Sequence, residues 1–351
     1  MVTTESPPSF SAAAGRLKIA MVCDFFYPRF GGVENHIWSI SQSLLKLGHK
    51  VIVITHSYDD RSGVRWMSGG LKVYYTPLAA PFDQASVPTL FGFLPMIREI
   101  LIREQIQLVH GHQATSQLTH ESLFHARALG LPTVYTDHSL FGFSDMASIN
   151  VNKVLRFTLA NVEKCICVSN TCRENLVLRA SVDPARVLTL PNAVDSSNFK
   201  PNFSQRPGVD SETVNIVVMS RMVYRKGIDL LVGVLPLICA RFPQVKFIIG
   251  GDGSKMVLLH ETRERYLLHD RMELLGHVPH AKVQETLRRG NIFLNCSLTE
   301  SFCIAIVEAA SCGLFVVSTK VGGVAEVLPD ETVSRAIVFP CQWCCRLLDY
   351  C

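Results

Sequence analysis

The stretch LKIAMVCDFFYPRFGGVENHIWSISQSLLKLGHKVIVIT, residues 17–55, contains one complete strand–helix–strand unit. Its first part, 17–23, is a short apolar run. A glycine pair then leads into residues 33–48, where apolar side chains recur at helical spacing. Residues 50–55 are again apolar and largely β-branched. Because these strands are apolar on both faces, they predict a parallel sheet covered by helices on either side.

The same alternation continues along the chain and restarts once. In the first half, further apolar strands are predicted at 71–75, 106–112, 131–138, 164–169 and 186–190. In the second half, they are predicted at 214–220, 245–251, 272–276, 292–297 and 314–319. We therefore predict an α/β protein with two Rossmann-like, doubly wound domains that face a cleft, where ligands bind at the carboxyl ends of the strands.

A stretch rich in proline, asparagine and serine separates the two halves. We expect residues 17–195 to form the N-terminal domain, 196–211 the linker and 212–331 the C-terminal domain. Residues 1–16 are rich in serine, threonine, proline and alanine, and we expect them to be disordered. Residues 332–351 form a tail of different composition in which cysteines crowd together.

The composition excludes several classes of protein. Of the 351 residues, 48% are hydrophobic and 18% charged, with a formal net charge of +4. These values exclude a disordered chain, and the charge is too low for a dedicated nucleic-acid-binding protein. The sequence shows neither a signal peptide nor an apolar run long enough to span a bilayer. Most of the 12 cysteines lie singly in apolar runs, which predicts reduced, buried thiols.

Gly31 and Gly32 lie where the first strand turns into a helix. Residues without a Cβ let a ligand approach the backbone, and free N–H groups at a helix start attract an anion. A plain tight turn explains the same two residues. The pattern is not GxGxxG, and no acidic residue ends the second strand, which argues against an NAD-dependent oxidoreductase.

His138 follows a predicted strand, at the position that α/β proteins favour for chemistry. A structural histidine is the alternative. His110 and His112 end the preceding strand, but no carboxylate or cysteine lies at ligand spacing nearby. We therefore expect no metal site.

Arg221 and Lys226 lie between a strand end and a helix start in the second half. Two cations at this place can clamp a diphosphate, although a solvated basic loop is the alternative. Residues 250–255, GGDGSK, form a glycine turn without the P-loop pattern. A turn that caps the next helix explains them as well as a ligand contact does.

Glu300 lies in a loop after a strand, and Glu308 lies eight residues later in an apolar helix. A helix start there can meet phosphates, and an inward carboxylate can accept hydrogen bonds from both hydroxyls of a ribose. Glu300 would then reach hydroxyls of a transferred sugar. Two solvated glutamates are the alternative, but a glutamate within an apolar helix seldom lacks a partner.

Several motifs together resemble those of the family-4 retaining glycosyltransferases, which have the GT-B fold. They are FGGVENH (30–36), TDH (136–138), PNAVD (191–195), SRMVYRKG (220–227) and ESFCIAIVE (300–308). Longer stretches resemble the catalytic subunits of the phosphatidylinositol N-acetylglucosaminyltransferases, which carry out the first step of glycosylphosphatidylinositol-anchor synthesis. The resemblance runs from about residue 17 to about residue 329.

This resemblance implies that N-acetylglucosamine passes from UDP-N-acetylglucosamine to phosphatidylinositol with retention and without a metal or other cofactor. It assigns catalysis to His138 and Glu300 and donor binding to Gly31, Gly32, Arg221, Lys226 and Glu308. It also implies other subunits as partners, and a place at the cytoplasmic face of the endoplasmic reticulum membrane. The N-terminal domain would be the acceptor side and the C-terminal domain would bind the nucleotide sugar.

The chain departs from the family at its C-terminal end. Family members continue with a helix that crosses back to the first domain and with a hydrophobic membrane anchor. Residues 332–351 match neither, so we expect a truncated chain with a divergent tail. Two alternatives stay open: a family-4 transferase with another donor or lipid acceptor, and an inactive variant that only binds partner subunits.

The stretch SVPTLFGFLPMIREILIRE, residues 86–104, has an apolar side that is broad for a half-exposed helix. A lipid acceptor requires that some part of the first domain approach the bilayer. If this stretch meets the membrane, we expect Phe91 and Phe93 to insert at the level of the headgroups, with Arg98 and Arg103 meeting anionic lipid. A buried core helix is the alternative.

Overall fold

The computed structural model describes residues 15–328, apart from 30, 59, 82–83, 144, 196–197 and 209–210, together with the backbone of 336–339. Most of segment 1–16 and of tail 332–351, including the tail cysteines, therefore lies outside the described residues. Contacts divide the chain into two compact units. The first runs to Thr136 and includes Val154–Cys165, and the second contains Asp137–Lys153 and the residues from Ile166 onward. The domain boundaries inferred from the sequence stay a prediction.

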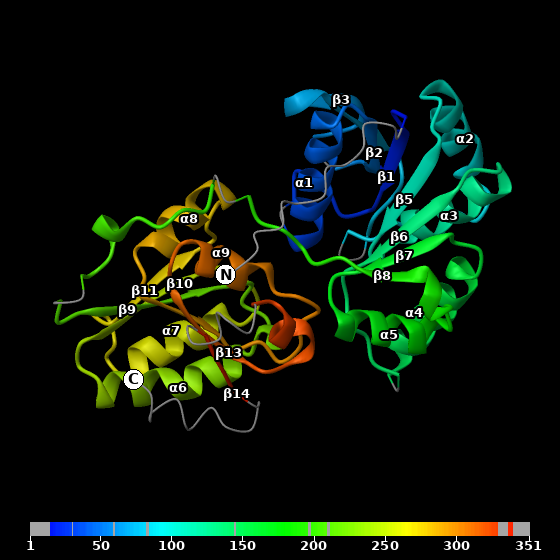
Figure 1. Ribbon diagram of the computed structural model, residues 1–351. Coiled ribbons are helices and arrows are strands. Elements are labelled where there is room, and N and C mark those ends of the chain that lie inside the picture. Colours follow the sequence, from blue (N-terminus) through cyan, green and yellow to red (C-terminus); the bar gives the residue numbers. More distant parts are fainter. Residues whose placement is uncertain are drawn as a thin grey trace, which may run out of the picture. The chain divides into compact units, whose positions relative to one another are not determined.

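The first sheet has eight strands in the order β3-β4-β2-β1-β5-β6-β7-β8 (Figure 1). Their bounds are β1 (Lys18–Val22), β2 (Lys50–His56), β3 (Gly63–Met67), β4 (Leu71–Thr76), β5 (Leu108–His112), β6 (Thr133–Asp137), β7 (Lys164–Cys167) and β8 (Val187–Thr189). Strands β4, β2, β1, β5 and β6 pair in parallel. The expected parallel sheet thus carries one antiparallel edge strand, β3, whose largely exposed side chains give no strand signal.

Five helices accompany this sheet: α1 (Gly32–Lys46), α2 (Leu94–Arg103), α3 (Gln117–Ala128), α4 (Met146–Leu159) and α5 (Asn170–Ala180). Helix α1 places Ile37 in a core with Met21 of β1 and Val53 of β2. Helix α3 packs closely on β5, since a Cβ at Gly111 would lie 2.5 Å from Thr119 Cγ2.

The second sheet has six strands in the order β11-β10-β9-β12-β13-β14 (Figure 1). Their bounds are β9 (Val214–Met219), β10 (Val245–Gly250), β11 (Met272–Gly276), β12 (Ile292–Asn295), β13 (Phe315–Thr319) and β14 (Ala336–Phe339). The helices are α6 (Ile228–Arg241), α7 (Met256–Arg265), α8 (His280–Arg288) and α9 (Ile304–Ser311). Short 3-10 turns are η1 (Ser68–Gly70), η2 (Pro184–Arg186), η3 (Phe203–Gln205), η4 (Tyr224–Lys226) and η5 (Gly322–Glu326).

Alternate residues of β9 point to opposite faces of this sheet, as the period of two requires. Ile216 packs in a core with residues of α6 and α7, whereas Val217 packs in a separate core with residues of α8 and α9. Helices therefore cover both faces, which confirms the predicted doubly wound architecture. Among the described residues, no helix is both long and apolar enough to cross a membrane. The eight described cysteines are free, and seven of them are buried.

Candidate active site

The turn after β9 places Lys226 close to the loop after β12. Gly227 has φ +67°, and a Cβ at this position would overlap the Cys296 carbonyl, so only glycine fits. The Leu298 N–H donates to the Arg225 carbonyl at 2.9 Å, which ties the two loops together. The carboxyl ends of two adjacent strands of the second sheet thus present their side chains side by side.

Lys226 Nζ forms an ion pair with Glu300 Oε1 across these loops. The Ser297 hydroxyl donates to the same carboxylate oxygen at 2.8 Å. Both charged side chains are partly buried, with 22% of Lys226 and 12% of Glu300 exposed. The structure therefore brings together the predicted phosphate cation and the predicted sugar-binding carboxylate.

Glu308 lies on the buried side of α9, with 6% of its surface exposed. Burial raises the pKa of its carboxyl from 4.5 to about 7. No hydrogen bond or ion pair to this carboxyl is present among the residues that the structure describes. The group is therefore suited to accept hydrogen bonds from a ligand, as predicted for ribose hydroxyls.

Cys303 lies just before α9 and between the acidic groups of the site. Its pKa is raised to about 12, mainly by burial and then by the charge of Glu300, while Lys226 opposes the shift and Glu308 adds to it. The residue has φ +71°, and no side chain caps the N-terminus of α9. Backbone N–H groups at this helix start are therefore available to an anionic ligand.

Two further predicted features of the second half are Arg221 and the glycine turn at residues 250–255. Arg221 is exposed and lies in none of the ion pairs of the described residues. In the glycine turn, Gly251 and Gly253 closely approach the carbonyls of Ser220 and Met222, which a Cβ would not allow. No side chain caps α7, so the alternative in which this turn caps the next helix is wrong. Gly251 and Gly253 allow the backbone to pack closely here.

His138 follows β6 directly and is partly exposed. Its neighbour Asp137 forms an ion pair with Arg179 of α5, and both side chains are 0% exposed. Sequence reasoning missed this pair, although Asp137 lies inside the TDH motif. An aspartate that is buried at the end of a strand needs a cationic partner. The position of Asp137 in the sequence could therefore have indicated that an arginine or lysine pairs with it.

In the first unit, Gly31 and Gly32 lie at the N-terminus of α1, which begins at Gly32. A Cβ at Gly31 would overlap the Glu34 carboxylate, whereas nothing lies within 4 Å of a Cβ at Gly32. His110 is structural: its Nε2 lies 2.7 Å from the Thr136 hydroxyl, and burial lowers its pKa to about 3.

Comparisons with known proteins identify the chain's relatives. It is 59% identical over 321 residues to a phosphatidylinositol N-acetylglucosaminyltransferase subunit from Arabidopsis thaliana, and the match covers 92% of this chain and 71% of the relative. The chain belongs to this family of transferase subunits. The human member of the family is 53% identical, over 90% of this chain and 64% of its own length.

Family models and solved structures agree with this membership. Residues 56–145 match the family described as PIGA (GPI anchor biosynthesis), and residues 199–343 match Glycosyl transferases group 1. A sucrose-phosphate synthase from Thermosynechococcus elongatus superposes with a TM-score of 0.75 at 21% identity, covering 95% of this chain and 88% of that one. The predicted family and the GT-B fold are confirmed, while the roles of the individual site residues stay predictions.

Proposed function

We propose that the chain transfers N-acetylglucosamine from UDP-N-acetylglucosamine to phosphatidylinositol, the first step of glycosylphosphatidylinositol-anchor synthesis. The observation that carries the proposal is the arrangement around the start of α9. An uncapped helix N-terminus there lies beside the Lys226–Glu300 pair and the buried Glu308 carboxyl. Cation, helix start and carboxyl suit the diphosphate and ribose of a nucleotide sugar, and membership of the family supports this donor and acceptor.

Donor binding would rearrange the Lys226–Glu300 ion pair. The diphosphate offers Lys226 a second and stronger anionic partner, with Arg221 and the N-terminus of α9 as further donors. Glu300 then keeps its hydrogen bond from the Ser297 hydroxyl and becomes free to accept hydrogen bonds from hydroxyls of the sugar. Glu308 accepts the ribose hydroxyls, which favours its charged form.

Transfer follows front-face attack with retention. The bond between the anomeric carbon and the β-phosphate oxygen breaks, and the inositol hydroxyl oxygen forms the new bond on the same face. The hydroxyl proton passes to the departing phosphate oxygen. Two cations and a helix N-terminus stabilise the leaving diphosphate, so the proposed reaction requires no metal. Membership of the family supports a role for His138 at the sugar, and roles for Gly31 and Gly32 in binding the donor and the acceptor.

A lipid acceptor lies in a bilayer, and the first unit offers a surface that fits one. Leu90 and Phe91, which precede α2, are 72% and 70% exposed. We call these two residues the tip. Leu90 has φ +54°, a strained conformation for this side chain. The prediction that Phe93 inserts as well is wrong, because Phe93 is 1% exposed and packs into the core.

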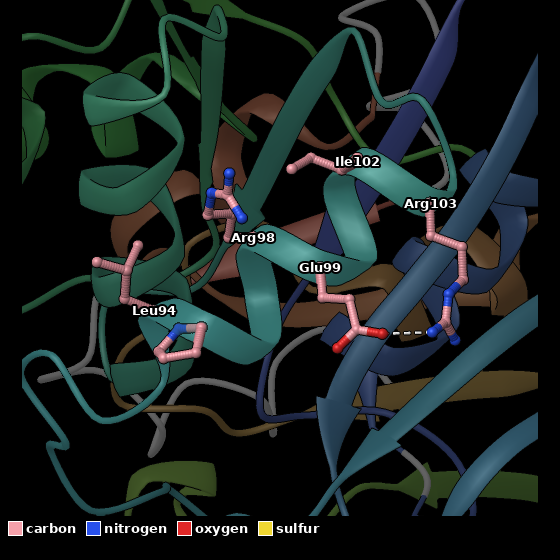
Figure 2. A pocket seen from close by; sticks show the side chains of 6 residues that line it. Leu94, Arg98, Glu99, Ile102 and Arg103 are labelled. Atoms are coloured by element: carbon pink, nitrogen blue, oxygen red, sulfur yellow. Dashed lines mark hydrogen bonds and ion pairs between the residues drawn. The ribbon is translucent and has the colours of Figure 1, made fainter.

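A buried carboxylate holds the tip in place. Glu121 of α3 accepts the N–H of Leu90 at 3.0 Å and the N–H and hydroxyl of Thr89 at 2.5 and 2.6 Å. Figure 2 shows the neighbouring outer surface of α2, where Glu99 and Arg103 form an ion pair. Arg98 takes part in none of the ion pairs of the described residues, so its charge is available to an anionic headgroup.

The tip is testable with a matched pair of variants. Phe91→Asp should abolish flotation with vesicles of phosphatidylcholine and phosphatidylinositol while leaving UDP binding intact. Phe203→Asp changes an equally exposed phenylalanine, at 70%, in the second unit, and should float like the wild type. Equal flotation of both variants would show that membrane approach depends on other parts of the protein.

Other subunits are part of the proposal, since the relatives are named as subunits. A place at the cytoplasmic face of the endoplasmic reticulum membrane is what the family resemblance implies. A substrate panel tests the chemistry. The chain should transfer sugar from UDP-N-acetylglucosamine in preference to UDP-glucose or GDP-mannose, and to phosphatidylinositol in preference to phosphatidylethanolamine. Preference for another donor would favour a different family-4 transferase, and binding of partner subunits without any transfer would favour an inactive variant.

A further inference from the structure

One buried arginine contacts both sequence neighbours of His138. Arg179 Nη2 donates to the Asp137 carboxylate and, at 3.3 Å, to the Ser139 carbonyl. The Cys172 thiol adds a contact of 3.7 Å to the Asp137 carbonyl. Helix α5 carries both Arg179 and Cys172. It therefore holds the end of β6 in place and, with it, the position of His138.

A second contact reaches His138 from the loop that carries Glu300. The Ser301 hydroxyl donates to the His138 carbonyl at 2.5 Å, across 163 positions of sequence. Ser301 is the residue directly after Glu300. One short side chain therefore connects the backbone of the two residues to which catalysis is assigned.

The loop at Glu300 is also held from its other side. The Gly323 N–H donates to the Glu300 carbonyl at 2.9 Å. A Cβ at Gly323 would overlap the Ser301 carbonyl and lie 2.6 Å from Ser169 Oγ, so the η5 backbone packs directly against this loop. The backbone at Glu300 and Ser301 therefore has little freedom to move relative to η5.

Helix α5 anchors η5 as well. The Glu326 carboxylate at the end of η5 accepts the N–H groups of Asn170 and Thr171, at 2.6 and 2.9 Å, and the Thr171 hydroxyl at 2.7 Å. The N-terminus of α5 thus holds η5 through Glu326, and its C-terminal half holds the β6 end through Arg179. Ser301 links the two, because its hydroxyl contacts His138 after β6 while its loop packs against η5.

We propose that Ser301 is a positioning residue, which keeps Glu300 and His138 in fixed register during transfer. The inference rests on the proposed function, because it assumes that both residues act on the same sugar. A positioned group contributes mainly when the reacting atoms must be aligned. Loss of the hydroxyl should therefore lower kcat while leaving the KM for the donor unchanged.

The test compares Ser301→Ala with Ser301→Thr in the transfer of N-acetylglucosamine to phosphatidylinositol. We expect kcat to fall about 10-fold in the alanine variant, as loss of one hydrogen bond and its alignment predicts. The threonine variant keeps the hydroxyl and should recover most of kcat. Ser43→Ala is the control, since it removes a hydroxyl that also donates to a main-chain carbonyl, that of Ser39 at 2.9 Å, but from α1.

Gly323→Ala provides an independent variant, because it displaces the Ser301 loop without changing its side chains. It should reduce kcat at least as much as Ser301→Ala does. Unchanged kcat in Ser301→Ala would overturn the inference, and so would a rise in donor KM at constant kcat. A lowered melting temperature with full activity would also overturn it. No transfer by the wild-type chain would instead refute the proposed function.

Discussion

The buried carboxyl of Glu308 makes the stability of the chain depend on pH in a direction that can be tested. Its pKa is about 7 in the folded chain and near 4.5 when exposed. A folded-state pKa that is raised means that stability is fully present below pH 4.5 and is lost as the pH rises through 7. At about 1.4 kcal/mol per pKa unit, the loss amounts to about 3 kcal/mol at pH 8.

Glu308→Gln removes this ionisation and keeps the shape of the side chain. The variant should melt at a higher temperature than the wild type at pH 8, and the two should differ little at pH 4.5. Differential scanning fluorimetry at both pH values measures the difference. Because binding by ribose hydroxyls favours the carboxylate, wild-type affinity for UDP-N-acetylglucosamine should rise about tenfold between pH 6 and pH 8. This donor, a diphosphate diester, has no ionisation of its own in that range.

Two results would refute this reasoning. A variant less stable than the wild type at pH 8 would show that the folded chain supports the charged carboxylate. An identical pH dependence of donor affinity in the wild type and in Glu308→Gln would remove Glu308 from the ribose site.

Three further substitutions address the rest of the site. Lys226→Ala should weaken UDP binding by about 1.5–3 kcal/mol in calorimetry, because a charge-assisted hydrogen bond to phosphate is lost. Lys246→Ala changes an exposed lysine and should leave UDP affinity unchanged. Equal UDP affinity of the two variants would contradict the role of Lys226 in clamping the diphosphate. Arg179→Met removes the arginine that pairs with the buried Asp137 carboxylate and should lower the free energy of unfolding by about 3–5 kcal/mol. An unchanged urea midpoint would contradict a stabilising role of this ion pair. His138→Ala should reduce turnover far more than donor affinity, because its contacts act in the transition state. A loss of equal size in both would place His138 in the binding shell.

Most strands and helices of both sheets were predictable because they depend on local patterns, whereas β14 lies in the segment expected to be a divergent tail. Short apolar runs between amphipathic segments indicated β1, β2 and β9, and Arg221 and Lys226 were visible between a strand end and a helix start. Strand β3 carried no such signal, since its five residues lie at a sheet edge with little burial. Its pairing depends on β4, which no local pattern reveals.

The candidate site was predictable residue by residue, but its connections were not. Lys226 and Glu300 stood out by charge and position, yet their ion pair spans 74 positions and arises only when β9 and β12 become neighbours. Arg179 and Ser301 gave no sign in the sequence, because one is an arginine in a helix and the other a serine in a loop. Their roles come from burial and from contacts made by the fold.

The segment before α2 shows a different limit. Its apolar residues were visible, but periodicity did not separate those facing the core from those facing solvent. The structure buries Phe93 and exposes Phe91, because α2 begins at Leu94 and Phe93 turns inward at its N-terminus. Of the two phenylalanines first expected to insert into the membrane, only Phe91 remains, and it does so together with Leu90 in the tip.

The most direct test of the central proposal is transfer in membranes that lack the native catalytic subunit. Such membranes are supplied with this chain and with radiolabelled UDP-N-acetylglucosamine, and the lipid products are separated by thin-layer chromatography. The proposal predicts labelled N-acetylglucosaminyl phosphatidylinositol with the wild-type chain and a strongly reduced amount with Lys226→Ala. Absence of this lipid while the folded chain still binds its partner subunits would contradict it.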